Sequence, residues 1–339
     1  MEARACIATA FYRTKGTSPN LRAFSNEMRI RSYYQCMVVF FATARRFCSN
    51  EALVLFANDP IPPKYKVHLD RVGVSVVVVP AHEIVYCSDS EITNQFPGCL
   101  FTLDVIRFFS RSQLHEEYAS LLLFDSDCFF IDGLDDLIGS LVDNGQVAGI
   151  PLDGYGVNHC VNGQTRASLS LLLAGMSQES DVRLLRYYGG EFYGFASSLA
   201  DVLSEEIGRC FAYVKSKVGV FGNTYTEEHI MSLVMNLRGD MLYAGSDRAI
   251  KRVWTADNYS NVDGTESSYS VLHLPAGKDK FFKNVFGRIE KAPLFLSEIP
   301  NNALRDLVMA HIESSAAPSI RRMLKNSIKG IAKRLLHLD

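Results

Sequence analysis

Buried strands and amphipathic helices alternate along the first third of the chain. Short apolar runs rich in β-branched residues predict strands, and longer apolar stretches with helical spacing predict helices. The predicted strands are residues 5–12, 52–56, 74–79 and 120–124, and the predicted helices are residues 21–47 and 100–110. Buried strands that alternate with helices form parallel sheets. The pattern therefore predicts an α/β fold with a mostly parallel, doubly wound, Rossmann-like sheet flanked by helices.

The pattern is more mixed in the second half. The predicted strands are residues 146–150 and 270–274, and the predicted helices are residues 199–214, 226–237, 304–312 and 320–338. Thr226 is the expected N-cap of its helix. The segment from Tyr187 to Phe195 mixes aromatic residues and glycines, and we expect its backbone to approach a ligand closely. Residues 314–318 are expected to be a linker.

Two carboxylates, Asp125 and Asp127, directly follow the predicted strand 120–124. Strands of such a sheet end at the edge where ligands bind. Two close carboxylates are costly unless something cationic joins them, and a hard divalent cation is a natural partner. His273 ends a later predicted strand, and an imidazole with two carboxylates suits Mn²⁺ better than Mg²⁺. The alternatives are solvated turn acids and a hydrogen-bonded core histidine.

On these residues the chain resembles the GT-A glycosyltransferases over most of residues 5–285. Asp125-Ser126-Asp127 stands where that fold carries its D-x-D motif, about a hundred residues after the first strand. The resemblance implies that Asp125, Ser126 and Asp127 hold Mn²⁺ or Mg²⁺ on the diphosphate of a nucleotide sugar. It also implies further contacts with the nucleotide, at Thr9, Ala10, Phe11, Tyr12, Asn58, Asp59 and, for the diphosphate, Arg107. A surface salt bridge is the alternative for Arg107.

The order of the second half is similar to that of the family 6 retaining galactosyl- and N-acetylgalactosaminyltransferases. There a Tyr-Tyr and Gly-Gly segment, here Tyr187 to Gly194, precedes an acidic pair on a helix, here Glu227 and Glu228. The resemblance implies retention, with Glu228 first and Glu227 second as the carboxylate beneath the anomeric carbon. Under an inverting mechanism Glu191 would be the general base instead. Alternatively, the acidic pair only complements the helix dipole.

His273, Gly277 and Lys278 are similar to the His-x-x-Gly-x-x-Lys of the family 8 transferases, one residue out of step. The resemblance implies that His273 binds the metal and that Gly277, Lys278 and Lys280 meet the phosphates. Such lysines would neutralise the charge of the departing diphosphate. The alternative is that they are solvated loop lysines.

These features predict a metal-dependent hexosyltransferase that moves a sugar from a UDP-sugar to a saccharide or glycolipid acceptor, in cell-surface or capsular polysaccharide synthesis. We expect a catalytic domain over residues 1–290, with residues 1–127 binding the nucleotide and residues 128–290 the acceptor, then a helical extension and linker over 291–318. One alternative is a non-catalytic protein that binds sugars or nucleotide sugars. Another is a D-x-D phosphatase, although its motif normally follows the first strand. A calcium loop is excluded by Phe129 at its fifth position.

Composition and charge limit the class of protein, its possible partners and its cellular compartment. Hydrophobic residues make up 47% and charged residues 21%, which excludes a disordered chain, and the net charge of −2 gives no indication of a nucleic-acid partner. Eight cysteines without a C-x-x-C pair predict reduced, buried thiols in a cytoplasmic protein. Residues 319–339 carry six basic residues and one acidic residue and predict an amphipathic helix. We expect it to bind an anionic membrane surface on the inner face, or alternatively to pack on the domain.

Overall fold

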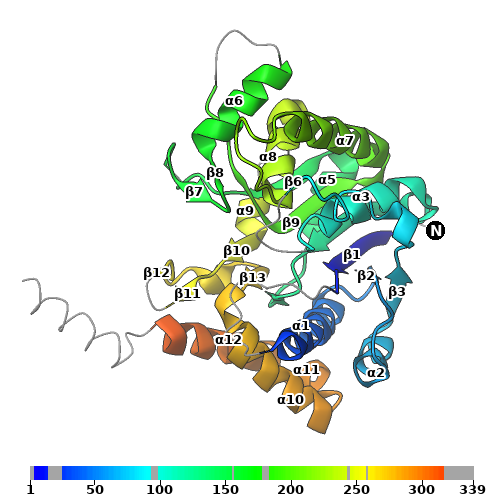
Figure 1. The fold of residues 1–339 in the computed structure, drawn as a ribbon. Helices are drawn as coiled ribbons and strands as arrows, with labels where there is room; N and C mark the ends of the chain where they lie inside the picture. Colours follow the sequence, from blue (N-terminus) through cyan, green and yellow to red (C-terminus); the bar gives the residue numbers. More distant parts are fainter. Residues whose placement is uncertain are drawn as a thin grey trace, which may run out of the picture.

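A six-stranded sheet lies at the centre of the computed structural model, with helices on both of its faces (Figure 1). The structure describes residues 4–13, 25–92, 98–154, 156–177, 183–242, 245–256 and 259–316. The strand order is β3-β2-β1-β4-β9-β6. The strands are β1 (Arg4–Phe11), β2 (Ala52–Ala57), β3 (Val74–Val78), β4 (Tyr118–Phe124), β6 (Val147–Pro151) and β9 (Tyr188–Ala196). The predicted α/β fold class is confirmed.

The order of the strands reverses at β1. The chain builds β2 and β3 on one side of β1 and then crosses to place β4 on the other side, parallel to β1. Open α/β sheets bind ligands at such a switch point, outside the carboxyl ends of the strands. β9 runs antiparallel to both β4 and β6, so the sheet is mostly but not wholly parallel.

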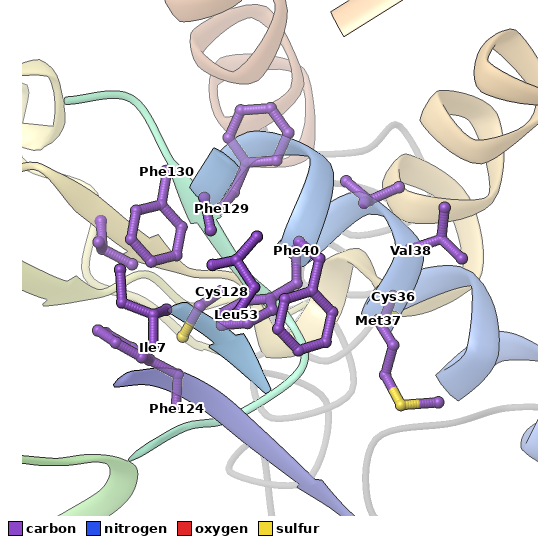
Figure 2. Packing of buried hydrophobic residues seen from close by; sticks show 14 of the residues in the cluster. Ile7, Cys36, Met37, Val38, Phe40, Leu53, Phe124, Cys128, Phe129 and Phe130 are labelled. Carbon is purple, nitrogen blue, oxygen red and sulfur yellow. The ribbon is translucent and has the colours of Figure 1, made fainter. Parts of the chain in front are cut away.

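Side chains of the central strands alternate between two hydrophobic clusters. Ile7, Leu53 and Leu122 join one cluster with α1 (Asn26–Phe47), and Cys6, Val54 and Leu121 join the other with α3 (Phe101–Arg111) and α7 (Ala200–Ser216). Figure 2 shows the first cluster, where the ring of Phe40 lies 5.9 Å from that of Phe124 and 5.5 Å from that of Phe130. Successive side chains of a buried strand point to opposite faces of the sheet, so each strand packs against both layers of helices.

A small second sheet, β10-β13-β5, adjoins the carboxyl end of β4, from which the chain continues through Asp125-Ser126-Asp127 into β5. Its strands are β5 (Cys128–Phe130), β10 (Ile250–Arg252) and β13 (Val271–His273). In its register Arg252 pairs with His273, and His273 pairs with Cys128. Three residues far apart in the sequence are therefore neighbours next to Asp127.

The remaining elements surround these two sheets. The other helices are α2 (Pro63–Arg71), α4 (Leu114–Glu117), α5 (Asp135–Asn144), α6 (Arg166–Ser177), α8 (Glu227–Leu237), α9 (Ser246–Ala249), α10 (Lys283–Lys291), α11 (Phe295–Glu298) and α12 (Asn301–Ala316). Two antiparallel pairs are formed by β7 (Cys160–Val161) with β8 (Gln164–Thr165) and by β11 (Thr255–Ala256) with β12 (Tyr259–Ser260). The short turns of helix are η1 (Ala81–Glu83), η2 (Ser197–Leu199), η3 (Gly239–Met241), η4 (Glu266–Ser268), η5 (Pro275–Gly277) and the π-helical η6 (Lys278–Phe282).

The C-terminal helices pack onto α1. Leu296, Leu304 and Val308 are buried in the same hydrophobic cluster as α1, and the Arg46 guanidinium donates to the carbonyl oxygens of Leu296 and Ile299. α12 runs through Ala316, so the part of the expected linker that the structure describes is helical instead. The predicted basic helix at 319–339 lies outside the described residues.

Two further expectations concern the cysteines and the membrane. All eight cysteines are free, and five of them are buried. Burial raises the pKa of the Cys48 thiol to about 12, and the pKa values of Cys6, Cys36 and Cys128 rise as well. Across the described part of the chain, no helix combines the length and the apolar character needed to cross a membrane.

Candidate metal centre and carboxylate cluster

Asp125, Asp127 and His273 meet at the carboxyl end of β4. Each offers one possible metal-ligand atom, and these atoms lie within 4.8 Å of one another. His273 Nε2 is 3.4 Å from Asp125 Oδ2 and 3.3 Å from Asp127 Oδ2. The small sheet brings them together, because β13 pairs with β5 and the Leu274 N–H donates to the Asp127 carbonyl at 3.0 Å. The predicted proximity of the three side chains is confirmed.

This set of atoms fits a divalent cation. Carboxylate oxygens suit Mg²⁺ and Mn²⁺, and the imidazole favours a transition metal. Neither buried ring nitrogen of His273 makes a well-oriented hydrogen bond to any described residue. Buried polar atoms nearly always have such a partner. A cation between the carboxylates and the ring would supply it.

Lys278 adds a buried positive charge. Its Nζ lies 2.7 Å from Asp127 Oδ2 and 5.5 Å from the centre of the Tyr33 ring. Burial by itself would raise the pKa of Asp127, but the charges of Lys278 and His273 hold it below its ordinary value. Burial would lower the pKa of His273, but the two carboxylates raise it to about 9. Asp127 is therefore ionised at neutral pH, as a metal ligand must be, whereas a metal ion would have to displace a proton from His273.

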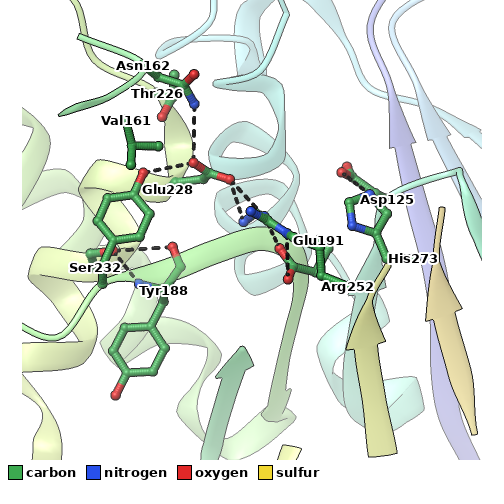
Figure 3. A network of polar contacts seen from close by, with 12 residues as sticks. Asp125, Val161, Asn162, Tyr188, Glu191, Thr226, Glu228, Ser232, Arg252 and His273 are labelled. Atoms are coloured by element: carbon green, nitrogen blue, oxygen red, sulfur yellow. Dashed lines mark hydrogen bonds and ion pairs between the residues drawn. The ribbon is translucent and has the colours of Figure 1, made fainter. Parts of the chain in front are cut away.

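Glu228, at the start of α8, is held by four donors. Its Oε1 accepts from the Gly190 N–H at 3.0 Å and from Arg252 Nη2 at 3.2 Å. Its Oε2 accepts from the Tyr187 hydroxyl at 2.8 Å and from Asn162 Nδ2 at 3.3 Å. Figure 3 shows this network, with Arg252 lying between Glu228 and His273.

Glu191 joins the same network from β9. Its carboxylate is fully buried and forms an ion pair with Arg252, in which Nε lies 3.0 Å from Oε1. Its carbonyl accepts the N–H of Asp125 at 3.0 Å, so the carboxylate cluster, which consists of Glu191, Glu227 and Glu228, adjoins the candidate metal centre. The glycine-rich segment around Glu191 is a buried antiparallel strand.

The two acidic residues at the start of α8, Glu227 and Glu228, lie in different environments, which shift their pKa values in opposite directions. Burial raises the pKa of Glu227, and the negative charges of Glu228 and Asp125 raise it further. Burial would also raise the pKa of Glu228, but Arg252 and the Gly190 N–H outweigh burial and hold it below its ordinary value. Glu228 is therefore the ionised member of the pair.

The residues predicted to bind the base and ribose lie at the ends of β1 and β2. Thr9 is buried within β1, and the Tyr12 ring packs at 5.3 Å from that of Phe101. Asn58 Oδ1 accepts from the Arg13 N–H at 2.7 Å, which ties the two strand ends together. Ala10 is partly buried on β1.

The predicted phosphate-binding residues are more scattered. Ser126 is buried between the two aspartates, and Gly277 is buried in the turn before Lys278. Lys280 is exposed on the same turn of helix. Arg107 donates to Glu83 Oε2 at 2.7 Å, which is the salt bridge given as the alternative.

The site also contains Arg252, Tyr187 and Asn162, which were not predicted from the sequence. Arg252 ends a three-residue strand, and its two carboxylate partners stand 61 and 24 positions away. Nothing in the local sequence marks such a residue. Tyr187 lay inside the aromatic–glycine segment, which was the available signal.

No family model matches the sequence, and no curated protein matches it. Among solved structures, the apo structure of the bifunctional glycosyltransferase WbbM is similar to this chain, with a TM-score of 0.48 and 10% sequence identity. The likeness covers 80% of this chain and 46% of that one, so the chain spans less than half of that protein's length.

Proposed function

We propose that this chain is a metal-dependent glycosyltransferase of the GT-A type, which transfers a sugar from a nucleotide sugar. The observation that carries the proposal is the group Asp125, Asp127 and His273 at the switch point of the sheet. Its atoms fit Mn²⁺ or Mg²⁺, and the residue types and their order agree with the resemblance described above. A cation there would neutralise charge on the diphosphate of the donor.

The chain's own residues divide the remaining work. Lys278, beside Asp127, would face the diphosphate as it departs and stabilise its negative charge. Thr9, Ala10 and Tyr12 would hold the base and ribose. The acidic pair Glu227 and Glu228 would lie at the transferred sugar and support retention of its anomeric configuration.

The donor is proposed to be a UDP-sugar and the acceptor a saccharide or glycolipid, in synthesis of a cell-surface polysaccharide. NMR of the first-formed product tests the stereochemistry. An α-linked product from an α-linked UDP-sugar supports retention, and a β-linked product would instead assign Glu191 as the general base.

Asp127→Asn tests the metal site, with Asp143→Asn on an exposed part of α5 as its control. We expect Asp127→Asn to abolish Mn²⁺-dependent release of UDP from a panel of UDP-sugars, and the control to keep it. Wild-type turnover in excess EDTA would contradict the proposal. Binding of UDP-sugars without any turnover would instead identify a binding protein.

Association with an anionic membrane through residues 319–339 remains a proposal from the sequence. Deleting these residues should abolish co-sedimentation with vesicles that contain anionic lipid, while leaving turnover of the free enzyme unchanged. Loss of folding on deletion would favour packing of this segment on the domain.

A further inference from the structure

The carboxylate of Glu228 has no lone pair left for a substrate. Its two oxygens accept four hydrogen bonds, at 2.8–3.3 Å, from Gly190, Arg252, Tyr187 and Asn162. An ionised carboxylate offers about four lone-pair positions. All the hydrogen-bond acceptor positions of Glu228 are therefore used within the protein itself.

Glu227, its neighbour, is held less completely, although its carboxyl group interacts with the Cys99 thiol. Its Oε2 is buried and has no hydrogen-bond partner among the residues that the structure describes. Glu227 lies beside Gly190, where an added Cβ would come within 2.6 Å of Glu227 Oε1, and it is close enough to Asp125 for that negative charge to raise its pKa. A buried carboxyl oxygen without a partner is costly, and a hydroxyl group of a bound sugar would remove that cost.

Arg252 binds two of the carboxylates, those of Glu191 and Glu228. Its guanidinium binds Glu191 through two nitrogens, Nε and Nη2, and reaches Glu228 Oε1 from Nη2 at 3.2 Å. A guanidinium fork can hold two carboxylates in fixed geometry, which the point charge of a lysine cannot do. Arg252 also stands next to His273 in the register of β10 and β13. The residue that holds the two carboxylates therefore lies in the same small sheet as His273, the third candidate metal ligand.

We propose that Arg252 is a positioning residue that clamps Glu191 and Glu228 beside the metal centre, and that Glu227 is the carboxyl group that contacts a hydroxyl of the transferred sugar. This inference rests on the function proposed above. It differs from the expectation of the sequence analysis, in which the resemblance placed Glu228 first and Glu227 second as the carboxylate beneath the anomeric carbon.

Arg252→Met, with Arg252→Lys as the conservative variant, tests the clamp. We expect Arg252→Met to bind Mn²⁺ and UDP within about threefold of wild type, but to lose about 100-fold in kcat, the cost typical of a misplacement of about 1 Å. Arg252→Lys should recover part of the loss, because it can still pair with one carboxylate. Thermal denaturation establishes that each variant is folded. If Arg252→Met does not fold, Arg252→Lys alone tests the clamp, and we expect its kcat to fall by about tenfold.

Lys251→Met is the matched control on the same strand. Lys251 pairs with Asp263 at 2.6 Å and Glu266 at 2.9 Å, and neither partner belongs to the carboxylate cluster. We expect this variant to be less stable and to keep its kcat. Equal losses of kcat in the Lys251 and Arg252 variants, or a wild-type kcat in Arg252→Met, would overturn the clamp.

Glu227→Ala tests the sugar contact through binding alone. UDP has no transferred sugar, so this variant should bind Mn²⁺ and UDP as wild type does and lose about tenfold or more in affinity for the UDP-sugar. Wild-type affinity for both ligands would overturn the contact. A wild-type protein that binds neither Mn²⁺ with UDP nor any UDP-sugar would overturn the proposed function itself, and the inference with it.

Discussion

Lys278 Nζ lies 2.7 Å from Asp127 Oδ2, and both side chains are buried. The ammonium group occupies one side of a carboxylate that also faces His273 at 3.3 Å. In the protein without a cation, Lys278 is the nearest permanent positive charge to Asp127. The stability of this region and its metal binding are therefore linked through one carboxylate.

Lys278→Met should lower the free energy of unfolding of the metal-free protein by up to about 3–5 kcal/mol, because it removes the closer of the two positive charges beside a buried carboxylate and leaves only His273. Mn²⁺ should then raise the Tm of the variant more than that of wild type, since the cation supplies the missing charge. Denaturant unfolding with EDTA and with Mn²⁺ measures both effects. Lys280→Met, at an exposed position on the same turn, is the control and should be nearly neutral.

His273→Ala should weaken Mn²⁺ binding by about 10–100-fold, the range typical when a metal site loses a contributing group. Calorimetric titration of the folded variant with Mn²⁺ checks this. His82→Ala removes a histidine whose side chain is 79% exposed and should leave the titration unchanged. An unchanged titration of His273→Ala would make His273 a core histidine that the carboxylates hold.

The strands around the switch point could be predicted because their signals are local. Continuous apolar runs identify β1, β2 and β4, and the aspartates that follow β4 must then lie at its carboxyl end. The meeting of Asp125 and Asp127 with His273 was expected through a resemblance, and because an imidazole with two carboxylates suits Mn²⁺. The structure provides the physical reason, which is the antiparallel pairing of β13 with β5.

The carboxylate cluster could not be predicted, because its signals are not local. Gly189 and Gly190 of β9 are needed because carboxylates lie directly against the strand at these two positions. The direction of β9 depends on its partners on both sides, and so does the place of Arg252. α2, α5, α6 and α10 were not predicted either, since they are short or lack a strong apolar stripe.

Gly189→Ala tests the packing of this cluster against β9. An added Cβ would lie 2.6 Å from Arg252 Nη2 and would also clash with the Glu191 carboxylate. We expect a loss of about 1–3 kcal/mol in the free energy of unfolding, the usual cost of overpacking, with a lower kcat because the clamp shifts. Gly154→Ala is the control, since its Cβ would meet no atom within 4 Å. Equal stability of the two variants would contradict the close approach.

The burial of His229 makes the stability of the protein depend on pH. Its Nε2 donates to the Val161 carbonyl at 3.0 Å, and its Nδ1 accepts the N–H of the N-cap residue Thr226 at 3.0 Å. Burial lowers the pKa of His229 from 6.5 to about 4, although the charge of Glu228 partly opposes this. The folded protein therefore keeps the ring neutral, while the unfolded chain takes up a proton as the pH falls below about 6.5.

The contribution of His229 is fully present above the unfolded pKa and is lost as the pH falls from about 6.5 towards 4. Between pH 7 and pH 5 the wild type should lose about 1–2 kcal/mol of unfolding free energy through this residue. His229→Gln keeps a side chain that can both donate and accept, and it removes the titration. Urea unfolding of both proteins at the two pH values measures the difference, in which the shared carboxyl groups largely cancel. A wild type and variant that lose equal stability between pH 7 and pH 5 would show that the ring does not hold the neutral tautomer at the start of α8.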